Sequence, residues 1–255
     1  MSRSRGNKIA LSLPRRFICD LVHFAQQVPS VPVQRRMQLA EVSRARSAAV
    51  PKPSWCAIFT KALAIVAADR HELRRAYLKF PWPHLFEAHK SVASIAVERR
   101  YRDEDAVFFG RVDAPEERSL QVLDEKIRHL KNAPLESVGS FKQSIMVSKF
   151  PWPLRRMIWW LGLNLAGKFR CQRLGTFGVS SYAGLGANSL HPLTPITITL
   201  NYGPVGPDGQ VDVRLIYDHR VMDGATVARA LADMERVLTN EILLELHKIR
   251  QDVAA

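Results

Sequence analysis

The chain has 255 residues, of which 47% are hydrophobic and 24% charged, as is usual for a soluble globular protein with a substantial core. No apolar run approaches the roughly 20 residues that a membrane-spanning helix needs. The formal net charge of +13 is unusual. It predicts an acidic partner, such as a phosphate-rich cofactor, an acidic carrier domain, an anionic membrane surface or nucleic acid, unless the basic surface serves only solubility.

The N-terminus and the cysteines predict a cytoplasmic protein. Residues 1–13 form a basic arm whose apolar stretch before Pro14 is too short for a secretory signal. Cys19, Cys56 and Cys171 lie far apart, without a C-x-x-C pair or zinc-ligand spacing. We therefore expect three small core residues in a reducing compartment and no bound metal.

The first third of the chain predicts helices and one strand. Apolar residues recur at helical spacing over 17–26, and 31–42 alternates as a strand does. The segment 54–68 is apolar nearly all round, which predicts a helix in the centre of the core with Ser54 as its N-cap. We expect 71–79 to continue this helix as a more polar segment.

The middle of the chain combines sheet and helix patterns. Segments 91–98 and 106–112 predict strands, and 119–131 predicts a surface helix that covers a sheet. The tetrapeptide Phe-Pro-Trp-Pro occurs at 80–83 and 150–153, where closely spaced prolines favour extended geometry and end helices.

A short apolar helix is predicted over 154–167, where Trp159 and Trp160 are flanked by basic residues. Such a helix would suit peripheral contact with a membrane. The interpretation we favour is a helix buried against its own domain or a neighbouring subunit.

After Gly175 the chain turns to strands. Segments 176–182, 196–202 and 210–217 predict strands, the last two joined as a hairpin by the turn residues 206–209. The second hairpin strand leads directly to His219. A helix follows over 225–238.

The run Tyr-Asp-His-Arg-Val-Met-Asp-Gly at 217–224 is the most informative motif. Neutral His219 at the end of a strand can take a proton from an attacking thiol or hydroxyl near pH 7 and return it to the leaving group. Asp223 can contact His219 or hold the loop by pairing with an arginine, and it lies where a helix N-terminus favours a carboxylate. The alternative is a loop histidine before an N-capping aspartate. Acyl transfer also needs an oxyanion donor, for which Ser180 and Ser181 are candidates.

These motifs resemble a known family. LIYDHRVMDGATVARAL is similar to the signature of the catalytic domain of the acyltransferase component of 2-oxo-acid dehydrogenase complexes, which shares the chloramphenicol acetyltransferase fold. GTFGVSSYAGLG resembles a second motif and places Ser180 on the serine that stabilises the tetrahedral intermediate. Further positions that match are Asp218, His219, Arg220, Asp223, Gly224, Arg15, Arg16, Ile18, Pro29 and Lys61.

The resemblance implies a fold, an assembly and a site. The fold would be a chloramphenicol acetyltransferase-like α/β two-layer sandwich, with a mixed sheet covered by helices, formed by one catalytic domain over 14–255. The assembly would be a homotrimer in which His219 of one subunit, as general base, faces Ser180 of the next. Coenzyme A or acyl-CoA would enter as a substrate. The catalytic residues would be His219, Asp223 and Ser180, with Asp223 ordering the site. Structural support would come from Arg15, Arg16, Gly224 and Asp218, one of the two arginines being a partner of Asp223.

Several departures leave the second substrate open. We expect this chain to lack the usual lipoyl and subunit-binding domains and therefore a covalent lipoyl group. Ser30 replaces a family histidine. The stretch 140–170 does not resemble the family. The acyl group could come from a lipoyl or acyl-carrier domain of another protein, or a lipid-like acceptor could lie near Trp159 and Trp160. Assembly of trimers into a cage is also open.

Other functions are weighed against this one. A non-catalytic trimeric assembly protein that has lost activity is the main alternative. Condensation and polyketide-associated acyltransferases carry H-H-x-x-x-D-G, but residue 218 is Asp here and the chain is too short for their two lobes. Specific nucleic-acid binding would rest on charge alone.

Overall fold

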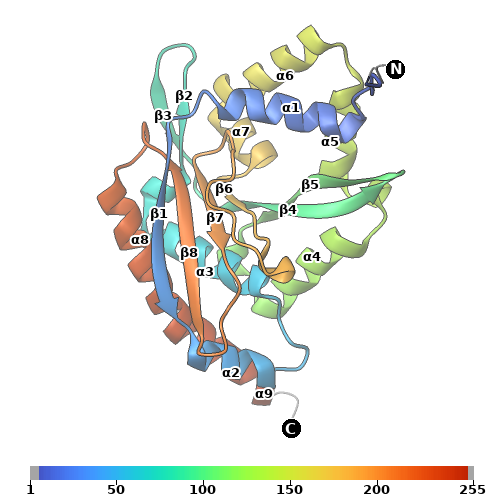
Figure 1. Cartoon of the computed structure of the whole chain (residues 1–255). Helices are drawn as coiled ribbons and strands as arrows, with labels where there is room; N and C mark the ends of the chain where they lie inside the picture. The colour runs from blue at the N-terminus through green and yellow to red at the C-terminus, as the bar shows by residue number, and fades with distance from the viewer. Residues whose placement is uncertain (1–5, 252–255) are drawn as a thin grey trace, which may run out of the picture.

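A six-stranded mixed sheet organises the fold, in the order β1-β8-β7-β6-β4-β5 (Figure 1). The computed structural model describes residues 6–251. Strands β7 and β6 run parallel, as do β6 and β4, whereas the other neighbours are antiparallel. The strands are β1 (Ser30–Gln38), β4 (Val92–Tyr101), β5 (Glu104–Asp113), β6 (Phe177–Val179), β7 (Ile198–Tyr202) and β8 (Gln210–Asp218), with β2 (Arg75–Leu78) and β3 (His84–Glu87) as a separate antiparallel pair.

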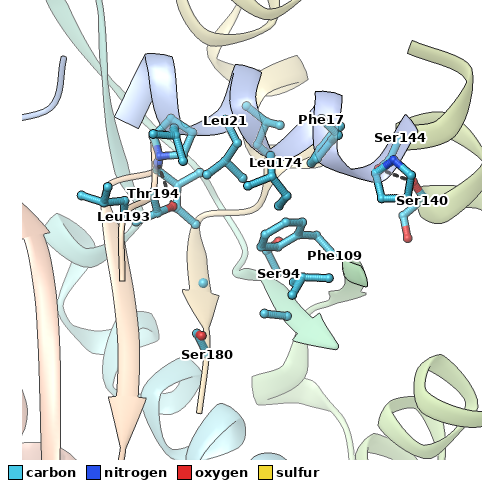
Figure 2. A pocket seen from close by; sticks show the side chains of 18 of the residues that line it. Phe17, Leu21, Ser94, Phe109, Ser140, Ser144, Leu174, Ser180, Leu193 and Thr194 are labelled. Carbon is cyan, nitrogen blue, oxygen red and sulfur yellow. Dashed lines mark hydrogen bonds between the residues drawn. The ribbon is translucent and has the colours of Figure 1, made fainter. Parts of the chain in front are cut away.

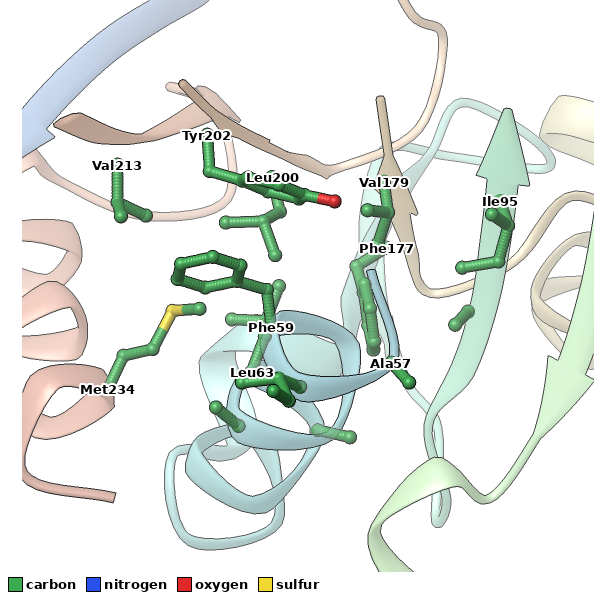
Figure 3. Packing of buried hydrophobic residues seen from close by; sticks show 14 of the residues in the cluster. Ala57, Phe59, Leu63, Ile95, Phe177, Val179, Leu200, Tyr202, Val213 and Met234 are labelled. Atoms are coloured by element: carbon green, nitrogen blue, oxygen red, sulfur yellow. The ribbon is translucent and has the colours of Figure 1, made fainter. Parts of the chain in front are cut away.

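Most helices pack on one face of this sheet and enclose the main core. Phe59 of the central helix stacks on Tyr202 of β7 with ring centroids 4.3 Å apart, and Leu200 and Met234 lie beside it (Figure 3). These helices are α2 (Ala40–Ala48), α3 (Trp55–Asp69), α4 (Leu120–Asn132), α8 (Gly224–Val237) and α9 (Leu243–Gln251), with the π-helical turn η5 (Leu238–Ile242) between the last two. The short 3-10 turns are η1 (His71–Arg74), η2 (Pro115–Glu117), η3 (Leu135–Ser137) and η4 (Ala183–Leu185).

Helix α1 (Leu13–Ala25) lies over the opposite face of the sheet, above β4 and β5 (Figure 1). It packs against α5 (Gly139–Lys149) and α6 (Trp152–Asn164), and α7 (Gly167–Leu174) leads into β6. The helix α1 itself spans Leu13–Ala25 and is capped by Ser12, whose hydroxyl accepts from the Arg15 amide.

A buried ion-pair cluster joins α1 to α6. Asp20 accepts from Arg155 Nε at 2.7 Å, and Arg156 Nε lies 3.1 Å from its other oxygen. Asp20 is 1% exposed and Arg155 9%. The cluster fixes α6 over the sheet, because a buried charge is stable only when it is paired.

The structure confirms most predicted elements. The helices predicted over 54–68, 119–131 and 225–238 are α3, α4 and α8, and the amide of Ala57 donates to the predicted cap, Ser54. The alternating segments and the hairpin that leads to His219 form as expected.

Some predicted boundaries are wrong. Segment 71–79 does not continue α3, because Arg75–Leu78 pairs as β2 with β3. The strand predicted over 31–42 ends at Gln38, where α2 begins after Leu39. The strand predicted over 176–182 is only β6, Phe177–Val179. The second Phe-Pro-Trp-Pro segment starts helix α6, because a proline in the first turn of a helix loses no hydrogen bond.

Two further expectations need adjustment. Cys19 is exposed, so the prediction of three core cysteines is wrong for that residue. Helix α6 buries Trp159 and Leu163 against α1, as favoured, but its outer face is exposed at Met157, Trp160, Leu161 and Leu165. Contact of that face with a membrane or another subunit stays a prediction. In the described range, no helix is long and apolar enough to cross a membrane.

Candidate active site

His219 directly follows the C-terminal end of strand β8. The His219 backbone amide donates to the carbonyl of Pro29 at 3.0 Å, so the chain is fixed immediately before β1. The His219 side chain is 49% exposed. The backbone of His219 is therefore held in place while about half of its side chain is exposed.

Asp218 and Arg220 form the structural pair beside His219. Asp218 is buried and accepts from Arg220 Nε at 2.9 Å, from Nη2 at 2.7 Å and from the Arg220 backbone amide at 3.0 Å. The Arg220 guanidinium also lies over the ring of Tyr77 on β2, 4.4 Å from its centroid. This bidentate pairing of Arg220 with Asp218 holds the turn that contains His219. No local sequence pattern predicts this contact between Arg220 and Tyr77.

Asp223 lies near His219 but is loosely held. Its carboxylate oxygen is 3.6 Å from His219 Nδ1, which exceeds hydrogen-bond length, and the side chain is 85% exposed. Asp223 is the N-cap residue of α8 without a capping side-chain bond. A small movement would let it accept from Nδ1 and leave Nε2 free, because catalytic hydrogen bonds are often long before substrate binds.

Gly224 serves close packing. A Cβ there would lie 3.2 Å from the Tyr217 hydroxyl, and the φ of Gly224 is not positive. The absence of a side chain at Gly224 therefore leaves room for Tyr217. The Tyr217 ring lies 5.5 Å from the His219 ring.

The structure does not bring Arg15 or Arg16 to Asp223. Arg16 Nε donates to the carbonyl of Leu11 at 3.1 Å, and Arg15 lines the cavity beneath α1. Within residues 6–251, neither arginine forms an ion pair with Asp223. A pairing of Arg15 or Arg16 with Asp223 of a neighbouring subunit stays a prediction.

Ser180 follows β6 and faces a cavity (Figure 2). Its amide donates to the Leu200 carbonyl at 3.0 Å, and Asn201 Nδ2 donates to its carbonyl at 2.6 Å. Ser181, the other candidate, uses its hydroxyl to donate to the Tyr202 carbonyl and to accept from the Ala183 amide. Of the two candidates, Ser180 therefore lines the cavity, whereas the Ser181 hydroxyl is bonded to backbone groups.

The cavity beside Ser180 has a volume of about 560 Å³. It lies between α1 and the sheet and is closed at the sides by α5, α6, α7 and the segment 192–196. Figure 2 shows Phe17 and Leu21 of α1 above it, with Phe109 of β5 and Ser180 below. Within the described part of the chain, His219 is not among the residues that line it.

His219 and Ser180 of one chain lie at opposite ends of the sheet. Strands β6 and β7 run in the same direction, and β8 is antiparallel to them. The C-terminal ends of β6 and β8 therefore lie at opposite ends of the strands in the sheet. Ser180 follows Val179, which is level with Leu200 and Leu215, whereas His219 lies four residues beyond Leu215. Strand geometry then separates the two residues by roughly 20 Å. A site that uses both needs His219 from one chain and Ser180 from another.

Solved structures share this fold over nearly their whole length. A probable dihydrolipoamide acetyltransferase from Listeria monocytogenes is 15% identical, with a TM-score of 0.66 over 93% of this chain and 96% of that chain. The dihydrolipoamide acetyltransferase of Azotobacter vinelandii is 17% identical, with a TM-score of 0.68 over 94% of each chain. Its catalytic mechanism has been studied at a serine, a histidine and an asparagine four residues after that histidine.

The same fold occurs in the core of a multienzyme complex. The truncated catalytic core of the 2-oxoacid dehydrogenase multienzyme complex from Thermoplasma acidophilum is 14% identical, with a TM-score of 0.64 over 92% of this chain and 99% of that chain. No protein-family model and no curated protein sequence matches the chain. At these identities the likeness establishes the fold, and it confirms the predicted fold class.

Proposed function

We propose that this protein is a coenzyme-A-dependent acyltransferase in which His219 is the general base. His219 removes the proton from a thiol or hydroxyl acceptor, whose sulfur or oxygen then attacks the thioester carbonyl of acyl-CoA. The Ser180 hydroxyl donates to the oxyanion of the tetrahedral intermediate. The intermediate collapses, the carbon–sulfur bond breaks, and the coenzyme A thiolate takes the proton from the imidazolium. The products are the acylated acceptor and free coenzyme A.

One observation carries this proposal: His219 is held by its backbone at the end of β8 with an exposed imidazole and a carboxylate four residues later, 3.6 Å away. The Azotobacter enzyme has an asparagine at that spacing from its histidine. Asp223 is charged where that residue is neutral. A carboxylate there can orient the imidazole and stabilise its protonated form.

The proposal includes a homotrimer whose sites lie between subunits. The roughly 20 Å between His219 and Ser180 within one chain supports it, as does the fold shared with cores of multienzyme complexes. The ligand or partner protein that binds this chain would be acidic. The net charge of +13 favours coenzyme A phosphates or an acidic carrier domain supplied by another protein.

The test measures release of the coenzyme A thiol from a panel of acyl-CoAs with thiol and hydroxyl acceptors. His219→Ala should lower turnover by about 10²–10⁴-fold, the usual contribution of a general base. His89→Ala, at a histidine outside the site, is the matched control and should keep turnover unchanged. Turnover that His219→Ala leaves intact would reject the mechanism. A stable trimer without turnover toward any acceptor would favour the assembly protein instead.

A further inference from the structure

The cavity beneath α1 is apolar over most of its wall. Phe17 and Leu21 of α1 and Phe109 of β5 line it (Figure 2). Trp159 of α6 also lines it. Its volume of about 560 Å³ falls within the usual range of small-molecule sites, roughly 300–1,000 Å³. A cavity of this kind suits an occupant that is mainly hydrocarbon.

Small side chains on one face of the sheet open this cavity. Ser94 and Ala96 line it, whereas the alternating residues Ile95 and Val97 point to the main core on the other face. Gly178, level with Ser94 on β6, also lines it. The sequence thus leaves one face of β4 and β6 without bulky side chains, while the core face is filled.

Two arginines lie at one side of the cavity without a carboxylate partner. Arg173 Nη1 donates to Gln143 Oε1 at 3.0 Å, and Arg111 Nη2 approaches the same oxygen at 3.5 Å. Other Arg111 bonds go to the backbone carbonyls of Gln172 and Arg173. Over residues 6–251, neither guanidinium forms an ion pair. Burial and the nearby Arg173 charge lower the pKa of Arg111, so an anion between the two would relieve an unfavourable arrangement.

The acidic residues of the lining are at the other end of β5. Glu104 and Asp105 belong to the β4–β5 hairpin tip, and Glu98 pairs with Val107. Phe109 separates that end from Arg111. The cavity therefore has a cationic end and an acidic end with apolar walls between them.

The strand register gives the span from the arginines to Ser180. Arg111 pairs with Ser94, which pairs with Gly178, and Ser180 is two residues further along β6. Arg111 and Ser180 are thus two strands apart and two residues apart along the strands. Their Cα atoms are then roughly 12 Å from each other. An unbranched chain of medium length can reach from one to the other.

We infer that the cavity binds an apolar chain with an anionic group, a carboxylate or a phosphate, held by Arg111 and Arg173. The other end of the chain, which carries the acceptor thiol or hydroxyl, is presented at Ser180 as the second substrate of the reaction. The part played in the reaction rests on the proposed function, whereas binding of the chain can be measured without turnover.

Calorimetric titration of the full chain with decanoate, decyl phosphate, decanol and butyrate tests this inference. Decanoate or decyl phosphate should bind at least about tenfold more tightly than decanol, because a charge-assisted hydrogen bond is lost with the alcohol. The tighter of the two identifies the anionic group. Butyrate, which has six fewer methylenes than decanoate, should bind roughly 4,000-fold more weakly, because each buried methylene contributes about fourfold.

Two sets of variants locate the binding. The double variant Arg111→Gln with Arg173→Gln should reduce decanoate affinity to that of decanol, and Arg229→Gln, at an exposed arginine of α8, should not. Ala96→Phe places a ring in the cavity and should weaken every long-chain ligand by at least about tenfold. Ala228→Phe, at an exposed position, is its control. Thermal unfolding of each variant verifies that it is folded.

Equal affinity for decanoate, decyl phosphate and decanol would overturn the inference. Binding that Ala96→Phe does not weaken would also overturn it, as would the absence of any binding. The binding measurements can fail or succeed independently of the coenzyme A release assay. Coenzyme A release that depends on His219 without chain binding would leave the proposed function in place. The predicted binding pattern without turnover would retain the inference and remove the proposed reaction.

Discussion

At the scale of the residue, the two aspartates near His219 differ in their surroundings. Asp218 is buried against Arg220, and Asp223 is exposed at the start of α8. The sequence motif contains both, and its resemblance to a known family predicts a structural role for Asp218 and a catalytic role for Asp223. Burial separates them: Asp218 holds the turn in place, and Asp223 is free to approach the imidazole.

Replacing Asp218 with asparagine should therefore reduce stability. The change leaves the Arg220 charge without its partner. Breaking a buried pair costs about 3–5 kcal/mol, and we expect about 2 kcal/mol here because Arg220 is partly exposed. Urea unfolding of Asp218→Asn measures this loss. A change in midpoint within error of wild type would contradict the structural role of the pair.

Asp223→Ala should have the opposite effect, with stability nearly unchanged and turnover reduced. Removal of the carboxylate takes away its support of the protonated imidazole, so kcat should fall about tenfold to a hundredfold. Steady-state kinetics and urea unfolding of the same preparation measure both. Wild-type kcat with reduced stability would mean that Asp223 acts only as a cap.

At the scale of the element, the helices α5, α6 and α7 form the side walls of the cavity. They span residues 139–174, and together with α1 they line the cavity. The charge cluster of Asp20 with Arg155 and Arg156 attaches α6 to α1.

Asp20→Ala should weaken this attachment strongly. It leaves Arg155 buried and unpaired, which costs about 3–5 kcal/mol. Glu41→Ala, in an exposed pair with Arg44, is the matched control and should leave stability unchanged. Urea unfolding of the two variants provides the comparison. Equal midpoints would show that Asp20 is not needed for the attachment.

Local patterns predict the elements of this fold better than their attachments. Segments 54–68 and 210–217 have clear periodicity, and both form as expected. The pairing of β2 with β3 interrupts the expected continuation of α3, because backbone pairing with a distant segment overrides local propensity. Asp20 and Arg155 are 135 residues apart in the chain. No local spacing indicates that they meet.

At the scale of the whole molecule, the sequence names candidate residues but not their arrangement. His219 and Ser180 can be identified from their motifs, whereas their separation follows from the antiparallel course of β8 against β7. The cavity arises where small residues of β4 and β6 face α1. That arrangement depends on strand order and helix placement, which neither motif contains.

The central claim is that His219 of one subunit acts with Ser180 of another, and hybrid trimers test it most directly. His219→Ala and Ser180→Ala chains are coexpressed in equal amounts, and coenzyme A release is compared with that of each variant alone. Every mixed trimer contains one interface with both native residues. Random assembly then restores about one quarter of the wild-type activity, since about three quarters of the trimers are mixed and a third of their sites are intact. Recovery near this value is the result that we predict. Activity no higher than that of the separate variants, from trimers verified to be mixed, would contradict the claim.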